Sequence, residues 1–319
     1  MIKLLTTSRA RSGARNRTTI SATIPESNFG RIGNPLIVAP ASRGCIGAIA
    51  QPLSASNSKF AIATVDPIAT DAGIKAFMEG GNAFDAAISA GLTLGVVYGY
   101  NSGIGGGCFI IGRKSNGEIF VINGRERAPF KAHEKMFVKN GKPLSNLSKE
   151  GALSIAVPGA LMAYSALCEN HGRTPFKNHL ENAAKIAEEG FIISKSFSKR
   201  IQASKDKLRK HSSYSEIFLN SDGTAKKEGS LLKQIDLAKT YRGIAKNGTD
   251  WFYKGPFARA TAKWMKQNGG ILNENDFEAI QGFAHELTAQ FSARLFDQAG
   301  NFEDGNISST SLHLSLIHI

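Results

Sequence analysis

Residues 101–107 read Asn-Ser-Gly-Ile-Gly-Gly-Gly, and this glycine run restricts the fold more than any other stretch of the chain. Glycines ahead of an apolar strand let the backbone approach other backbone where a Cβ atom would clash. Residues 109–111 and 119–123 are predicted strands, and Asn116-Gly117 between them is a typical hairpin turn. Arg125 lies just beyond the second strand. An antiparallel hairpin would therefore bring the glycine run and Arg125 to the same end of a sheet.

Arg125 is the candidate binding residue of this hairpin. Its planar guanidinium can donate two parallel hydrogen bonds to a carboxylate, so it suits a ligand that carries this group. The alternative is a structural arginine that pairs with the neighbouring Glu126. Arg127 lies two residues further on, so an extended backbone would turn it to the opposite side. The residues alone leave both interpretations of Arg125 open.

The glycine run is not a nucleotide-binding signature. It lacks the lysine of a phosphate loop and the spacing of a dinucleotide fingerprint. Close packing of a helix against the strands explains these glycines without a ligand, and we predict that role for them. Gly159, which follows Pro158, is likewise predicted to start a helix rather than to form a site.

Regular structure is predicted from residue 60 onward. Residues 61–65 form an apolar run that is typical of a short strand. Asp66-Pro67 then supplies an N-cap and a first-turn proline for a helix that ends at Gly80-Gly81. Its predicted apolar stripe consists of Ile74, Phe77 and Met78.

A second helix at 83–97 is apolar on nearly every side, which predicts that it is buried. Its single charged residue, Asp85, is predicted to be a hydrogen-bonded residue near the N-cap rather than a catalytic group. Further helices are predicted at 159–170, 177–189, 195–210, 231–246, 256–267 and from Asn273. One basic cluster is predicted to be a solvated helix face, made of Lys199, Arg200, Lys205, Lys207, Arg209 and Lys210.

The net charge of +13 is concentrated near the N-terminus. Residues 1–60 contain eight Lys or Arg residues and one acid, so more than half of the excess lies there. No interleaved aromatic residues or known motif accompany this charge, and we therefore predict no nucleic-acid partner. No apolar run approaches the roughly 18 residues of a membrane span, which predicts that the chain has none. No secretory signal is evident either, so the sequence leaves the compartment open.

The cysteines and histidines show no spacing that is typical of metal ligands. Cys45, Cys108 and Cys168 are widely separated, which predicts neither a disulfide framework nor a zinc site. Cys108 is predicted to be a small buried apolar side chain. The histidines accompany no nucleophile motif, and no base is assigned among His133, His171, His179, His211, His285, His313 and His318.

Several segments occur in the same order as in the large subunit of γ-glutamyltransferases (glutathione hydrolases), and the chain resembles that family. The matching segments are the 101–107 loop, 63–87 (ATVDPIATDAGIKAFMEGGNAFDAA), 121–137 (VINGRERAPFKAHEKMF), 151–164 (GALSIAVPGALMAY), 171–176 (HGRTPF), 183–191 (AAKIAEEGF) and 251–277 (WFYKGPFARATAKWMKQNGGILNENDF). Together they extend over residues 59–281.

The resemblance implies an α+β fold of the N-terminal-nucleophile type, two sheets between helix layers (αββα), of which this helix-rich chain holds only part. It implies that Arg125 binds the α-carboxylate of a γ-glutamyl substrate such as glutathione, without a metal or organic cofactor. Family members cleave their own precursor and expose a threonine nucleophile at the start of a small subunit. No segment here matches that cleavage motif, so no catalytic residue is assigned. The missing small subunit is the predicted protein partner.

Three segments are predicted: a basic, disordered leader at 1–58, the family-like region at 59–281 and an unmatched tail at 282–319 of frameshift or adapter origin. The chain alone is predicted to lack transferase activity. A relative that processes poly-γ-glutamate, a cephalosporin-acylase-like relative and a non-catalytic fragment or binding module remain alternatives. Arg125 argues against the acylase, because this arginine suits an α-carboxylate. Family members are often periplasmic or extracellular.

Overall fold

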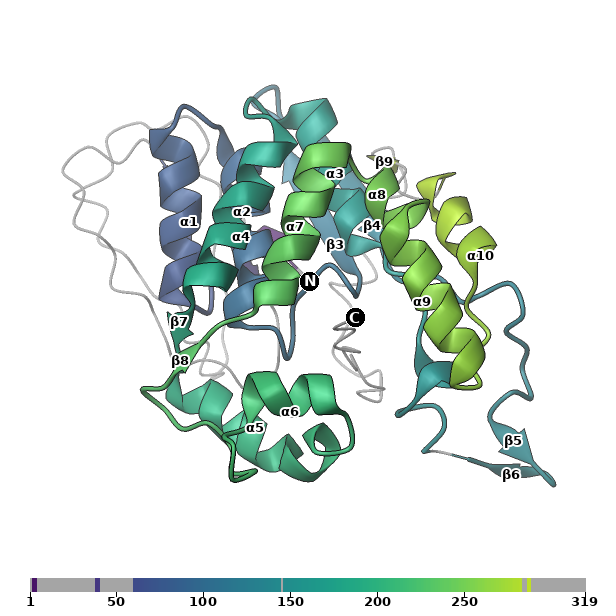
Figure 1. Ribbon diagram of the computed structural model, residues 1–319. Helices are drawn as coiled ribbons and strands as arrows, with labels where there is room; N and C mark the ends of the chain where they lie inside the picture. The colour runs from purple at the N-terminus through teal and green to yellow at the C-terminus, as the bar shows by residue number, and fades with distance from the viewer. Residues whose placement is uncertain (1, 5–37, 41–59, 145, 283–285, 288–319) are drawn as a thin grey trace, which may run out of the picture.

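The computed structural model describes residues 2–4, 38–40, 60–144, 146–282 and 286–287 (Figure 1). Most of the predicted leader (1–58) and of the predicted tail (282–319) lies outside the described residues. Within these segments, β1 (Ile2–Leu4) pairs antiparallel with β2 (Val38–Pro40), and β9 is Glu286–Leu287. Helices form most of the regular structure in the described part, which confirms the predicted helix-rich α+β class.

Helix α1 (Pro67–Met78) begins where the sequence predicted. The Asp66 side chain caps it by accepting a hydrogen bond from the Ile68 N–H at 2.9 Å. The predicted apolar stripe was wrong, because Ile74 and Phe77 are only partly buried and Met78 is 78% exposed. The buried face instead consists of the small residues Ala69, Thr70, Gly73 and Ala76. Small side chains let α1 pack closely on the next helix.

The predicted strand at 61–65 was wrong. Residues 60–64 form neither helix nor strand, and no described strand pairs with them. Thr64 turns inward instead, with its Oγ1 2.7 Å from the Asp66 carbonyl oxygen and 3.0 Å from Thr70 Oγ1. The segment therefore serves as the entry to α1 rather than as a sheet edge.

Helix α2 (Ala83–Val97) is buried on nearly every side, as predicted. It begins with a capping box in which Asn82 and Asp85 each accept a hydrogen bond from the other's backbone N–H. Helices α1, α2, α4 (Phe176–Glu189) and α7 (Ile235–Asn247) lie side by side in that order (Figure 1). Because α2 lies inside this layer, its sequence has to be almost free of charge.

Strands β3 (Cys108–Arg113) and β4 (Ile119–Gly124) form the predicted antiparallel hairpin. Its turn contains Gly117 at φ +92°, a left-handed conformation that favours glycine. Strand β9 pairs with the other edge of β4, which gives a three-stranded sheet in the order β3-β4-β9. Helix α3 (Ala160–His171) packs against β3 and β4.

The remaining helices lie close to their predicted positions. Helix α10 is capped by Asn273 as predicted, whereas two short helices, α6 and α8, were not predicted. The bounds are α5 (Lys195–Leu208), α6 (Ser212–Phe218), α8 (Asp250–Tyr253), α9 (Pro256–Gln267) and α10 (Glu274–Glu278). One continuous core joins α2, the sheet, α3, α4 and these C-terminal helices.

The predicted helix at 231–246 was wrong at its start. Leu231–Leu232 is strand β8, which pairs with β7 (Phe191–Ile192), and α7 begins at Ile235. Leu232 is fully buried opposite Phe191, so packing of these two side chains favours the strand pair over a further helical turn. The other short elements are β5 (Val138–Lys139), β6 (Lys142–Pro143) and the 3-10 segments Ala152–Ser154 and Ala279–Gly282.

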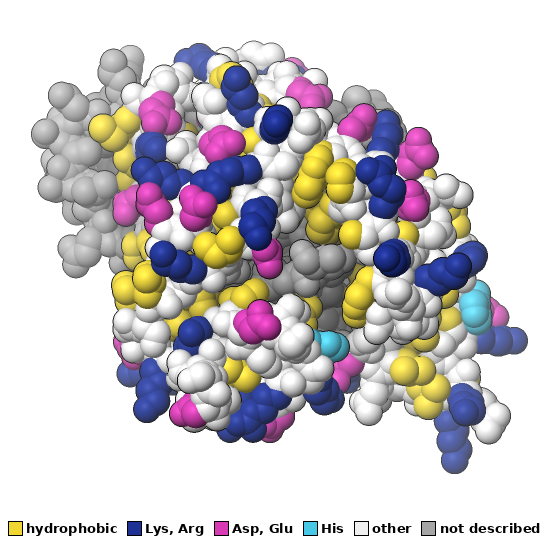
Figure 2. All heavy atoms as spheres, in the orientation of Figure 1, with side chains coloured by type: hydrophobic (Ala, Val, Ile, Leu, Met, Phe, Trp, Pro, Cys, Tyr) yellow, Lys and Arg dark blue, Asp and Glu magenta, His cyan; other side chains and the backbone are white. Residues whose placement is uncertain are grey.

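The basic cluster on and after α5 is a solvated face, as predicted. All of its six side chains are exposed except Lys205, which is partly buried, while Phe197 and Ile201 bury the opposite face. Figure 2 shows dark blue side chains in the lower part of the molecule, where Figure 1 places α5 and α6. None of the helices in the described part of the chain has the length and hydropathy that a membrane span requires.

Candidate functional site

The hairpin brings the glycine run and Arg125 together, as predicted. The strand register places Cys108, which follows the glycine run, opposite Gly124. A Cβ atom at Gly107 would lie 2.6 Å from Glu126 Oε2 and 2.7 Å from the Gly124 carbonyl oxygen. Only glycine therefore lets the loop pass the end of β4 at this distance.

The same loop fixes the start of α3. The Gly106 carbonyl oxygen accepts hydrogen bonds from the N–H groups of Gly159 and Ala160, both at 3.0 Å. N–H groups at a helix start have no partner inside the helix, so the loop satisfies two of them. A Cβ atom at Gly159 would lie 2.6 Å from the Gly124 carbonyl oxygen. The glycines thus pack a helix start against a strand end, the structural role that the sequence predicted.

Arg125 makes one ion pair and remains accessible. Its Nη1 lies 3.1 Å from Glu126 Oε2, and 48% of its side chain is exposed. Its backbone N–H donates to Asn123 Oδ1 at 3.1 Å, which fixes the chain direction after β4. The ion pair is the contact that a structural arginine would make, whereas the exposure is what a ligand-binding arginine needs. The guanidinium is half exposed, so a ligand carboxylate can reach it while the ion pair with Glu126 remains.

Arg127 has different surroundings. Its backbone forms a β-bridge with Val157, and its Cζ lies 4.5 Å from the centroid of the Phe130 ring. Its Nη1 donates to the Ala279 carbonyl oxygen at 3.5 Å. These partners differ from those of Arg125, in agreement with the opposite orientation that the spacing predicts. Arg127 therefore belongs to the packing of the 279–282 segment.

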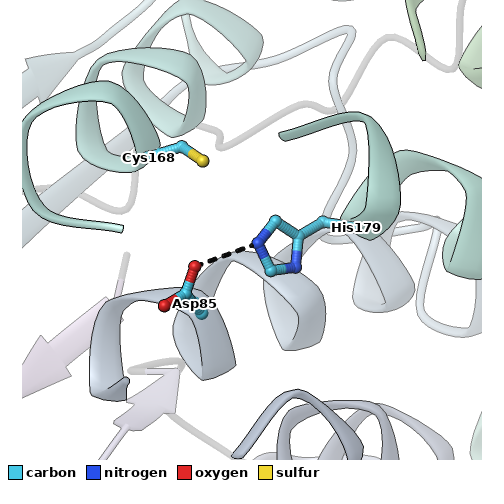
Figure 3. A group of neighbouring side chains, drawn as sticks. All are labelled: Asp85, Cys168 and His179. Atoms are coloured by element: carbon cyan, nitrogen blue, oxygen red, sulfur yellow. Dashed lines mark hydrogen bonds and ion pairs between the residues drawn. The ribbon is translucent and has the colours of Figure 1, made fainter. Parts of the chain in front are cut away.

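A second polar cluster lies between the helices (Figure 3). Asp85 of α2, Cys168 of α3 and His179 of α4 are all buried and offer ligand atoms that lie within 4.8 Å of one another. His179 Nε2 lies 3.2 Å from Asp85 Oδ1, and its Nδ1 lies 2.7 Å from Ser89 Oγ. The Cys168 thiol donates to the Thr174 carbonyl oxygen at 3.2 Å. The cluster joins three helices and the loop between α3 and α4.

The carboxylate of Asp85 is held in its charged form. Burial by itself would raise the pKa of Asp85, but hydrogen bonds from the His179 ring and from the N–H groups of Asn82, Arg173 and Thr174 lower it to about 2. The prediction that Asp85 is a hydrogen-bonded residue near the N-cap is therefore confirmed.

The two described cysteines are free and buried. Burial raises the pKa of Cys108 to about 12 and that of Cys168 to about 11, so both are thiols at neutral pH. Cys108 packs in the apolar core, as predicted. Cys168 differs because its Sγ points into the polar cluster (Figure 3).

Sequence reasoning did not find this second cluster, because 94 residues separate Asp85 from His179. Two signals pointed to it. One was a single charge inside an otherwise apolar helix, since a buried charge requires a hydrogen-bonding partner. The other was His179 on the buried face of an amphipathic helix. Neither signal identifies the partner without the fold.

A family model described as gamma-glutamyltranspeptidase matches residues 69–298, which include the hairpin and the polar cluster and extend past Gln281. The glutathione hydrolase proenzyme of Escherichia coli strain K12 is 33% identical over 266 residues. These residues make up 83% of this chain and 45% of the relative, so the chain spans less than half of that protein's length.

Solved structures show the same likeness. The γ-glutamyltranspeptidase of Helicobacter pylori superposes with a TM-score of 0.66 at 34% identity, over 70% of this chain and 63% of that chain. A cephalosporin acylase from Bacillus halodurans superposes with a TM-score of 0.60 at 27% identity, over 66% of this chain and 40% of that chain.

Proposed function

Because this chain belongs to the γ-glutamyltranspeptidase family, we propose that it binds the γ-glutamyl donor through Arg125. The predicted fold class, a partial N-terminal-nucleophile fold, is confirmed by the likeness to solved family members. The donor is an amide of the glutamate side chain, such as glutathione, and its free α-carboxylate matches the fork of a guanidinium. The observation that carries the proposal is a half-exposed Arg125 at the end of β4, beside the glycine loop.

The ion pair with Glu126 prepares Arg125 for this role. It holds the guanidinium by Nη1 and restricts its rotamers, while the exposed part of the side chain stays free to meet a ligand. A charge-assisted, bidentate contact with a carboxylate contributes about 1.5–3 kcal/mol. Removal of the guanidinium should therefore weaken donor binding by about 10- to 100-fold.

The transfer chemistry is proposed to come from a small subunit made from the same precursor. In the family, a threonine hydroxyl attacks the γ-carbonyl while the amine of the same threonine acts as the base, without a metal or organic cofactor. The described chain then supplies the binding of the donor and not its cleavage. Loss of a nucleophile removes far more transition-state stabilisation than one binding contact provides. The purified chain should therefore not release p-nitroaniline from γ-glutamyl-p-nitroanilide.

Calorimetry with glutathione tests the binding role. We expect wild-type chain to give a binding heat, and Arg125→Ala to lose it or to weaken binding by about 10- to 100-fold. Arg113→Ala is the matched control, because Arg113 is an exposed arginine at the opposite end of the same hairpin. Absence of heat from wild type, or equal affinity in Arg125→Ala, would contradict the proposal.

A ligand panel separates the family relatives. If Arg125 recognises an α-carboxylate, glutathione should bind and 4-aminobutyramide, which lacks this group, should not. Tighter binding of a γ-linked glutamate oligomer than of glutathione would favour a relative that processes poly-γ-glutamate. Equal binding of the amide without the carboxylate would favour an acylase-like pocket instead.

A further inference from the structure

The buried cluster of Asp85, Cys168 and His179 is independent of the proposed donor site. It brings a carboxylate oxygen, a sulfur and an imidazole nitrogen within 4.8 Å of one another, from three different helices. We propose that these residues bind one Zn²⁺ ion, or another divalent transition metal with the same ligand preference. Oxygen, sulfur and imidazole nitrogen are the donors that zinc takes in proteins, whereas Ca²⁺ and Mg²⁺ take oxygen donors.

The charges of the cluster suit a dication. The Asp85 carboxylate accepts hydrogen bonds from the backbone N–H groups of Asn82, Arg173 and Thr174, which favour its charged form, and a thiolate at Cys168 would add a second negative charge beside a neutral imidazole. The two negative charges cancel those of the metal, so the loaded site has no net charge. This neutrality matters because the three side chains are buried, and an uncompensated charge at a buried position is costly.

Metal binding would require only small movements of the three ligand atoms. Neighbouring ligands around tetrahedral zinc are about 3.5 Å apart, from metal–ligand bonds of about 2.0–2.3 Å. His179 Nε2 and Asp85 Oδ1 already lie at 3.2 Å, and the set as a whole has to close from at most 4.8 Å. Figure 3 shows the Cys168 sulfur directed toward the space between the other two side chains.

Metal binding would move the ring proton of His179 from Nε2 to Nδ1 and remove the proton of Cys168. Without metal, His179 Nε2–H donates to Asp85, and Nδ1 accepts from the Ser89 hydroxyl at 2.7 Å. With metal, the ring proton resides on Nδ1 and is donated to Ser89 Oγ, so the Nε2 lone pair binds the ion. The Cys168 thiol gives up its proton as the sulfur–metal bond forms. One proton is released for each ion bound, and nothing is oxidised or reduced.

Several hydrogen bonds outside the ligand set would orient the ligands. Ser89 fixes the tautomer of His179, and the N–H groups of Asn82 and Arg173 hold Asp85 Oδ2 at 2.8 Å and 3.0 Å. Metal-binding histidines usually have such a partner on the second ring nitrogen, and its loss weakens metal binding by about 10- to 100-fold. Ser89→Ala should therefore weaken the site without removing a ligand.

Cobalt absorption on the full, tag-free chain tests the proposal. After EDTA treatment, one Co²⁺ per chain should give a thiolate-to-cobalt charge-transfer band and strong visible bands of tetrahedral cobalt, both removed by Zn²⁺. Cys168→Ala should lose the charge-transfer band. Cys108→Ala is the matched control, because Cys108 is the other buried, free cysteine of the described residues, and it should keep the band.

The wild-type spectrum tests whether the cluster binds a metal ion even if a variant fails to fold. Absence of the charge-transfer band from folded wild type would overturn the proposal and leave a hydrogen-bonded network alone. A band that persists in folded Cys168→Ala would place the ion on another thiol and would overturn it as well. Far-UV circular dichroism establishes folding, and Co²⁺ affinity about 10- to 100-fold weaker in Ser89→Ala would support the assigned tautomer.

Discussion

Replacing Asp85 by Asn should destabilise the fold by about 2–6 kcal/mol. The carboxylate accepts hydrogen bonds from Asn82 at 2.8 Å, Arg173 at 3.0 Å, Thr174 at 3.1 Å and His179 at 3.2 Å. An amide retains one acceptor oxygen, so in either orientation its NH₂ group faces about two donors that lose their partner. Each buried donor left unpaired costs about 1–3 kcal/mol. A domain of ordinary stability has only about 5–15 kcal/mol in total.

The same substitution should change how stability depends on pH. The folded-state pKa of Asp85 is about 2, below the ordinary value of 3.8. The unfolded chain therefore takes up the proton first as the pH falls, and the stability that Asp85 contributes is lost between about pH 4 and pH 2. This difference corresponds to roughly 2 kcal/mol. Asp85→Asn cannot titrate, so it should lack this part of the acid sensitivity.

Urea unfolding, followed by circular dichroism in EDTA, measures both effects. Wild type and Asp85→Asn are compared at pH 7 and at steps down to about pH 2.5, with Asp71→Asn as the control. Asp71 is an exposed carboxylate on α1, and its substitution should change stability by less than about 0.5 kcal/mol. The reasoning is refuted if Asp85→Asn is as stable as wild type at pH 7, or if both lose stability equally below pH 4.

Two further substitutions test close contacts around α2 and α3, each by urea unfolding. Gly159→Ala would place a Cβ atom 2.6 Å from the Gly124 carbonyl oxygen, and should destabilise by about 1–3 kcal/mol; an unchanged midpoint would contradict the packing role of this glycine. Tyr241→Phe removes a buried hydroxyl that donates to the Leu92 carbonyl oxygen at 3.0 Å, and should destabilise by about 1–2 kcal/mol; no effect would mean that this bond contributes nothing net.

The parts of the fold that were predictable have local causes. The Asn116-Gly117 turn fixes the hairpin, and the caps at Asp66 and Asn273 fix two helix starts, because each signal acts within a few residues. The predictions for the apolar stripe of α1 and for the start of α7 were wrong because packing against distant parts of the chain decides these two features. Packing on α2 decides which face of α1 is buried, and pairing with β7 makes Leu231–Leu232 a strand. Neither partner can be identified from the sequence of the segment itself.

The two candidate sites also differ in how local they are along the sequence. Arg125 could be proposed from the sequence because the two strands, the glycine run and Arg125 lie within one short segment. The cluster of Asp85, Cys168 and His179 requires three helices to meet, so no spacing along the chain could reveal it. The sequence predicted no metal site because its cysteines and histidines show no ligand spacing, whereas the site proposed above depends on residues that only the fold brings together.

Helix α3 connects the two sites, yet they should respond independently. Its start is held by the Gly106 carbonyl oxygen and by Tyr253, whose hydroxyl donates to the Pro158 carbonyl oxygen at 2.9 Å. Cys168 lies about 12 Å further along the helix axis, near the end of α3, and belongs to the Asp85 cluster. Because the contacts at the start do not involve the end, a change at Asp85 should lower stability without moving Arg125. Calorimetry below the unfolding temperature should therefore give the same glutathione affinity for Asp85→Asn and wild type, whereas a tenfold loss would mean that α3 transmits the change along its length.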